Sequence, residues 1–237
     1  MLWKNLGYSH TDLRKGALVI KHRDGTTTPV IDASVHIFFG STPELRGVMR
    51  EPFKSRGFPP DYEMDWYGAP GGEYLEGTRG PDRQYPGSDP AFVAQQLFDD
   101  RGVDVAVLHP MGRGIMPDRH LGTAILAAHN EMMVSRWLDH PEFGGRFRGT
   151  IRVNPDDIRG ALREIEKYKD HPRVVQIGIP LQSRELYGKP QFWDLWERPS
   201  TPACRWRPIS RPVRASRSPR RRPGTPGPSS STWASVP

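Results

Sequence analysis

Residues 147–181 read FRGTIRVNPDDIRGALREIEKYKDHPRVVQIGIPL, and this stretch decides the fold. An apolar run at 147–153 is followed by a helical pattern at 155–170 and by a second apolar run at 173–181. The second run is apolar with little alternation, which is typical of strands that are covered on both faces of a parallel sheet. The order of strand, helix and strand therefore predicts two parallel strands joined by a helical crossover.

The same alternation extends to both sides of this stretch. It indicates either a doubly wound sheet or the first half of an eight-stranded barrel. No glycine-rich phosphate motif directly follows a predicted strand, which disfavours a nucleotide-binding protein. Further strands are predicted at 29–39 and 103–110, and further helices from Pro90 towards Gly102, at 119–139 and from 189 onward.

Two segments near the amino terminus differ from this pattern. Asp24-Gly25 lies between two β-rich runs and predicts a hairpin. Residues 41–88 are rich in Gly, Pro, Tyr and charged residues and show no sustained period. A loop of this length inside a compact domain is usually functional or disordered, and its aromatic residues favour a folded cover over a site.

The charge of the chain is unevenly distributed. The net charge is +7, from 34 Lys and Arg against 27 Asp and Glu, but residues 198–237 hold nine Arg and no acidic residue. Subtracting these nine leaves 25 basic and 27 acidic side chains in residues 1–197, a net charge of −2. A DNA-binding body is therefore excluded, and no specific nucleic acid is expected as a partner.

Other classes of protein are also disfavoured. The single cysteine, Cys204, excludes an intramolecular disulfide and a cysteine-rich zinc site. The first residues form no apolar signal segment, and no apolar run is long enough to span a membrane. We expect a soluble cytoplasmic protein without a membrane partner.

The sequence divides the chain into a body at 1–197 and an Arg/Pro/Ser-rich, unstructured tail at 198–237. The tail is either a genuine disordered segment, an arm that binds nucleic acid or an out-of-frame translation of GC-rich DNA. Deleting one base after the codon of Glu197 in a hypothetical DNA with chosen codons for EAAVDAGLPVAAHLETG reproduces residues 197–212, so the tail is compatible with a frameshift. The other frame completes the interrupted helix and adds an apolar strand, LPVAAHL, which is the element that the alternation requires next.

Polar side chains end the first parallel strand, at Asp32, Ser34 and His36. Alternate residues of a strand share a face, so these three are expected to point the same way. At the carboxyl end of a barrel strand they would reach the mouth of the active site, where a neutral imidazole can bind a divalent metal. His109, after the next strand, could line the same mouth, and Arg79 of the long loop could hold a substrate carboxylate.

The residues VIDASVH at 30–36 resemble the first-strand signature of the amidohydrolase superfamily, an apolar residue followed by Asp-x-His-x-His. The amidohydrolase-2 branch, which includes aminocarboxymuconate-semialdehyde decarboxylase-like enzymes, is the closer match. The resemblance covers about residues 28–197. It continues through FDDRGVDVAVLHP, RFRGTIRVNPDDIRGALREIE, and RVVQIGIPL followed by FWDLWE, which are similar to the next three strands of that branch with their helices.

This resemblance implies a distorted (β/α)8 barrel with one divalent metal, commonly zinc. His36 matches the second ligand of the first strand, Ser34 stands where the first ligand usually sits, and Asp32 matches an orienting residue. The strand-five His and the late Asp of the family have no counterpart in the sequence as written, although in the other reading frame the base sequence at Ile209 is compatible with His, Asp, Asn or Tyr.

The resemblance further implies a metal-dependent hydrolase or nonoxidative decarboxylase acting on a small organic acid, of which this chain is an inactive fragment with about four to five βα units. The intact parent could form a homo-oligomer. Two alternatives remain: a non-catalytic α/β ligand-binding module, and a scaffold whose basic tail binds nucleic acid.

Overall fold

A computed structural model describes residues 20–21, 25–57, 78, 85–112, 114–180, 185–197 and 205–209. Its main feature is a five-stranded parallel sheet in which every strand pairs with the next one along the chain. The predicted α/β class with a parallel, barrel-type sheet is confirmed. In order across the sheet the strands are β3 (Ile31–Ile37), β4 (Val105–Pro110), β5 (Phe147–Arg152), β6 (Val174–Pro180) and β7 (Arg205–Ile209).

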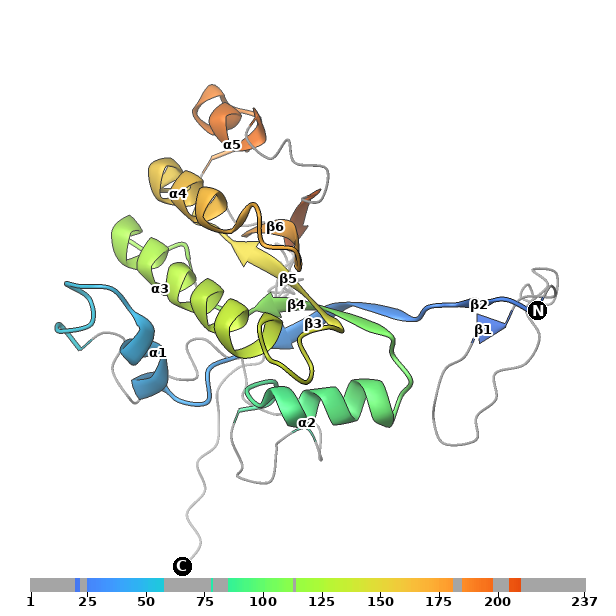
Figure 1. Cartoon of the computed structure of the whole chain (residues 1–237). Helices are drawn as coiled ribbons and strands as arrows, with labels where there is room; N and C mark the ends of the chain where they lie inside the picture. Colours follow the sequence, from blue (N-terminus) through green and yellow to red (C-terminus); the bar gives the residue numbers. More distant parts are fainter. Residues whose placement is uncertain are drawn as a thin grey trace, which may run out of the picture.

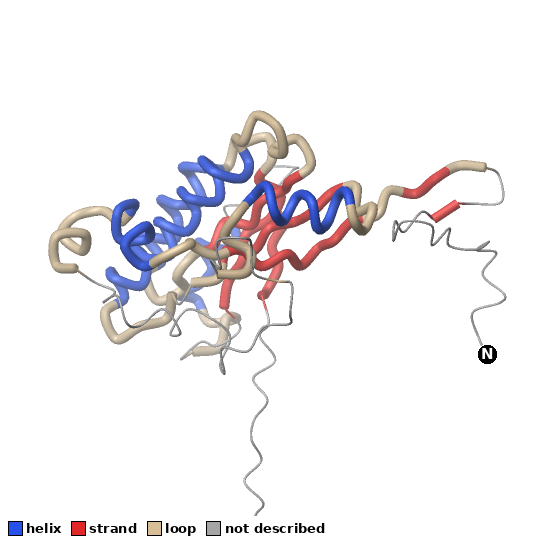
Figure 2. The backbone as a smooth tube through the Cα atoms, turned by 90° about the horizontal axis from the view of Figure 1, so that it is seen from below, coloured by secondary structure: helices blue, strands red, loops and turns tan. Residues whose placement is uncertain are grey.

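The helices between these strands follow one another around one side of the sheet (Figures 1 and 2). Three of the helices between the parallel strands begin at an aspartate cap, namely Asp89, Asp118 or Asp157. Each of these carboxylates accepts a hydrogen bond from at least one first-turn amide. These helices lie where the sequence predicts them. They are α2 (Pro90–Ala94) with the π-helical turn η2 (Gln95–Asp99), α3 (Arg119–Met132) with the π-helical turn η3 (Met133–Leu138), α4 (Ile158–Tyr168), and α5 (Trp193–Glu197) after the 3₁₀ turn η4 (Pro190–Phe192).

The predicted hairpin is present. Strands β1 (Ile20–Lys21) and β2 (Thr27–Thr28) pair in antiparallel register, and Gly25 between them has a φ of 83°. Figure 1 shows this pair lying away from the five-stranded sheet.

The segment 41–88, predicted as a loop, contains a helix that the sequence analysis missed. Helix α1 spans Thr42–Val48. The Ser41 Oγ accepts a hydrogen bond from the Glu44 amide, and the Glu44 carboxylate accepts one from the Gly40 amide. This reciprocal arrangement is close to a capping box, and its Ser-x-x-Glu signal was present in the sequence. Residues 58–77 and 79–84 lie outside the described residues.

The tail predicted to be unstructured also contains a strand. Strand β7 pairs with β6 from Gln176↔Arg205 to Pro180↔Ile209. The expectation of no regular structure from residue 198 onward therefore does not hold at 205–209. Pro208 lacks a backbone donor, which β7 tolerates because it lies at the edge of the described sheet. The rest of 198–237 lies outside the described residues.

The core lies between the sheet and its helices. Gly149 of β5 lets the strand approach the helical layer, because a Cβ there would lie 2.7 Å from Leu138 and 2.8 Å from Met133. The rings of Phe98, Trp137 and Phe147 pack together at the amino-terminal end of the strands. The apolar side chains of this core thus lie on the side of the sheet that the helices cover.

Two helical glycines give a matched test of this packing. A Cβ on Gly122 of α3 would lie 2.1 Å from the Gly114 carbonyl oxygen, whereas a Cβ on Gly47 of α1 meets nothing within 4 Å. Gly122→Ala should lower the free energy of unfolding by about 1–3 kcal/mol. Gly47→Ala should leave it unchanged or raise it by up to about 1 kcal/mol. Equal effects in urea denaturation would contradict the described contact between Gly122 and Gly114.

Candidate functional site

A bulge in β3 determines how its polar residues are presented. Asp32 is in register with Ala106 and His36 with His109, and the register shifts between Asp32 and Val35. Because residues 106 and 109 of β4 lie three apart, Asp32 and His36 are in register with opposite faces of the sheet. The prediction that they share a face is therefore wrong, since one extra residue breaks the alternation.

The described role of Asp32 is local to this bulge. Its Oδ1 accepts a hydrogen bond of 3.0 Å from the backbone amide of Ser34, two residues further on. Ser34 itself is exposed. Asp32 thus fixes the backbone of the bulge. Among the described residues, its side chain forms no hydrogen bond to the side chains of the other polar residues of the site.

His36 and His109 are brought together, as their positions at the ends of neighbouring strands predict. Their ring centroids lie 6.2 Å apart with the ring planes perpendicular. His36 is exposed, whereas His109 is 6% exposed. The pair therefore combines one accessible imidazole with one that is held inside the protein.

His109 is held by a chain of buried polar groups. Its Nε2 lies 2.9 Å from the Ala33 carbonyl oxygen and 3.3 Å from Gln176 Nε2, and Gln176 Nε2 donates to Thr150 Oγ1 at 2.6 Å. Because a carbonyl oxygen only accepts, a hydrogen bond to Ala33 requires a proton on Nε2 of His109, which then cannot also accept a hydrogen bond from the Gln176 amide nitrogen. Thr150 and Gln176 are buried and lie in register on β5 and β6. Four consecutive strands thus contribute to one polar row.

Arg152 brings positive charge to the carboxyl end of this row. It is the last residue of β5, is buried, and donates from its Nη1 to the Pro110 carbonyl oxygen at 2.7 Å. The backbone of Arg152 exchanges two hydrogen bonds with the Asn130 side chain of α3. This anchoring fixes the strand end from which the guanidinium projects.

A second buried histidine, His129 of α3, packs against the segment that links β4 to α3. His129 Nδ1 contacts the Ile125 carbonyl oxygen at 2.9 Å, and its ring packs edge-on against Phe39. Burial lowers the pKa of His129 from 6.5 to about 4, although hydrogen bonds to the Ile125 and Met111 carbonyls oppose this change. A Cβ on Gly112 would lie 2.8 Å from this ring, so the segment rests directly on the neutral imidazole.

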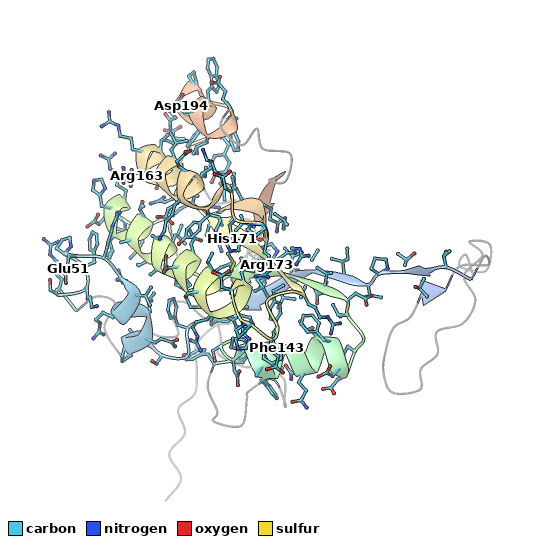
Figure 3. All side chains as sticks on the ribbon, viewed as in Figure 1. Glu51, Phe143, Arg163, His171, Arg173 and Asp194 are labelled. Carbon is cyan, nitrogen blue, oxygen red and sulfur yellow. The ribbon has the colours of Figure 1, made fainter. Side chains whose placement is uncertain are left out.

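The polar cluster at the opposite end of the strands has a structural role. His171 Nε2 lies 3.1 Å from an Asp139 carboxylate oxygen, and Arg173 approaches the same oxygen at 3.7 Å. Figure 3 labels His171 and Arg173, which precede β6. Their contacts join the start of β6 to the end of η3 and lie away from the row that contains His109.

The described residues do not fit a complete metal site. Within the described ranges, no three His, Cys, Asp or Glu side chains lie close enough to hold a metal ion. The Nε2 of His109 carries a proton directed at Ala33, so this atom is not a ligand in the described geometry. Arg79, predicted to hold a substrate carboxylate, lies outside the described residues.

The sequence analysis missed Thr150 and Gln176. A signal existed, because each is a polar residue inside an apolar strand that was itself predicted correctly. A polar side chain at such a position either forms a hydrogen bond inside the protein or points into a functional site. Their register with each other follows from strand pairing, which the sequence does not specify.

Comparison with known proteins gives distant similarities to solved structures. No protein-family model matches the chain, and no curated protein matches it significantly. The crystal structure of 5-carboxyvanillate decarboxylase from Sphingomonas paucimobilis is similar, with 23% identity and a TM-score of 0.49, over 71% of this chain and 48% of that chain. The chain therefore spans about half the length of that protein. Among the described helices, none has the length and apolar character needed to cross a membrane.

Removing the Thr150 hydroxyl tests the buried row. Thr150→Val should lower the free energy of unfolding by about 1–3 kcal/mol, because the Gln176 amide then remains buried without its 2.6 Å partner. The control is Thr27→Val, at an exposed strand position, where a change within about 0.5 kcal/mol is expected. A Thr150→Val variant as stable as the control would show that the row does not contribute to stability.

His129 should make stability depend on pH. The unfolded chain binds a proton to this residue below about pH 6.5, whereas the folded chain does so only near pH 4. The contribution is complete above pH 6.5 and is lost as the pH falls from 6.5 to 4, by about 3 kcal/mol. His129→Gln should flatten the profile of unfolding free energy in this window. Parallel profiles for the two proteins would contradict the assignment.

Proposed function

We propose that this chain supplies the first βα units of a hydrolase or nonoxidative decarboxylase of the amidohydrolase-2 type, acting on a small organic acid. The observation that carries the proposal is the polar row on the face of the sheet opposite the helices, with His36 and His109 side by side at its first two strands. In a parallel barrel, active sites form at the carboxyl ends of the strands. The resemblance of VIDASVH to the first strand of that family supports the same position.

The charge at this end of the sheet favours an anionic substrate. The guanidinium of Arg152 is at the carboxyl end of β5, and a positive group at such a position attracts a carboxylate. The imidazole of His36, at the same end of the sheet, is exposed and can donate or accept a proton. A small organic acid satisfies both features better than a neutral ligand.

The chain as written is proposed to be an inactive fragment. The described residues do not complete a metal site, and the ligands that the family places on later strands have no counterpart in the chain. In the other reading frame the apolar strand LPVAAHL would occupy positions 204–210 and so span β7 at 205–209. This coincidence of position supports an out-of-frame origin for residues 198–237, and a divalent metal, proposed to be zinc, would need the residues that the other frame encodes.

A pair of assays tests this function. The full chain, titrated with zinc by calorimetry, should show no stoichiometric zinc binding that depends on His36. The wild-type chain and His36→Ala should therefore give the same titration. A protein translated in the other frame after Glu197 should bind zinc and either decarboxylate or hydrolyse a carboxylated substrate, and His36→Ala should lower its turnover at least about a hundredfold.

The control for these assays is His140→Ala, whose ring stacks on Phe143 away from the polar row. This variant should keep the turnover of its parent. The proposal is wrong if the other frame closes with stop codons, or if its protein is folded and still turns over no carboxylated substrate.

A further inference from the structure

We propose that His109 is a positioning residue that holds the bulge of β3, and that it thereby sets the placement of Ser34 and His36. The sequence suggests a substrate contact for this histidine, and in the structure its Nε2 lies next to the Ala33 carbonyl and the Gln176 amide. The importance of the bulge for catalysis rests on the proposed function, whereas the hydrogen bond and its effect on β3 do not.

The bulge creates backbone groups that the strand ladder does not pair. Two residues, Ala33 and Ser34, stand opposite the single residue Val107 of β4. An extra residue of this kind leaves its own amide and carbonyl outside the regular ladder. Here side chains provide the partners, because Asp32 accepts from the Ser34 amide and His109 donates to the Ala33 carbonyl.

The imidazole of His109 is itself fixed in place. It is 6% exposed and lies beside Gln176 on β6, whose amide nitrogen donates to Thr150 Oγ1 on β5. The contact with Ala33 joins β4 to β3, so the bulge in the edge strand β3 is held by a side chain of the next strand inwards. A shift of the Ala33 carbonyl would carry Ser34 and His36 with it, since they are the next residues along the strand.

This role specifies which atom of His109 acts. The Ala33 oxygen accepts only, so this hydrogen bond requires a proton on Nε2 of His109. A Gln side chain places its amide nitrogen near the position of Nε2, whereas an Asn side chain reaches only to the position of Nδ1. His109→Gln should therefore preserve the hydrogen bond to Ala33, and His109→Asn and His109→Leu should lose it.

Hydrogen exchange of the full chain tests this assignment without metal or substrate. The Ser34 amide, which donates to Asp32 at 3.0 Å, should exchange several-fold to about tenfold faster in His109→Leu and His109→Asn, as expected for the loss of one hydrogen bond. His109→Gln should restore the wild-type rate. The Gly160 amide, capped in the same way by Asp157 at 3.0 Å, is the control and should not change.

Two kinds of result would overturn the inference. One is an equal exchange rate of the Ser34 amide in the His109→Gln and His109→Leu variants. Faster exchange of the Ser34 and Gly160 amides together would also overturn it, because His109 would then contribute only to the general stability of the fold. The other comes from nitrogen NMR of the wild-type chain, in which a proton on Nδ1 of His109 in place of Nε2 excludes the bond to Ala33, whether or not the variants fold. Neither readout depends on turnover, so failure of the proposed function and failure of this inference are distinguishable.

Discussion

Parallel strands can be joined only by crossovers, and this constraint organises the whole molecule. Each crossover returns the chain to the same end of the sheet. The carboxyl ends of β3, β4, β5, β6 and β7 therefore all lie at the opposite end. The helices lie around one side of the sheet, and the opposite face is left to the row that contains His109, Thr150 and Gln176. The position of the candidate site thus follows from the way in which the strands are connected.

The two ends of the sheet have different chemistry. At the amino-terminal end, the rings of Phe98, Trp137 and Phe147 pack together, and Arg146 lies 3.9 Å from the Phe98 ring centroid. At the carboxyl end lie the exposed imidazole of His36 and the buried guanidinium of Arg152. This division, with packing at one end and polar groups at the other, is the arrangement expected when a parallel barrel carries a site.

The strands and helices from β3 to α5 could be predicted because each has a strong local pattern, such as the apolar run around Leu108 or the helix begun by Asp157. The proximity of His36 and His109 could also be predicted, since both end neighbouring strands. The bulge that separates Asp32 from His36 could not, because it depends on the register between β3 and β4. Thr150 and Gln176 were visible as polar residues inside apolar strands, but their register with each other was not. Helix α1 was missed although its Ser41 and Glu44 cap was visible in the sequence.

The central proposal is that residues up to Glu197 form the first part of a barrel that later strands complete. The most direct measurement is the nucleotide sequence across the codons of Glu197 and Arg198, continued well beyond the codon of Pro237. The account predicts that the other frame opens there and runs through an apolar strand ending in His and on to a late Asp. Stop codons soon after Arg198 in that frame would contradict it, because the five-stranded sheet would then have to stand as a fold of its own.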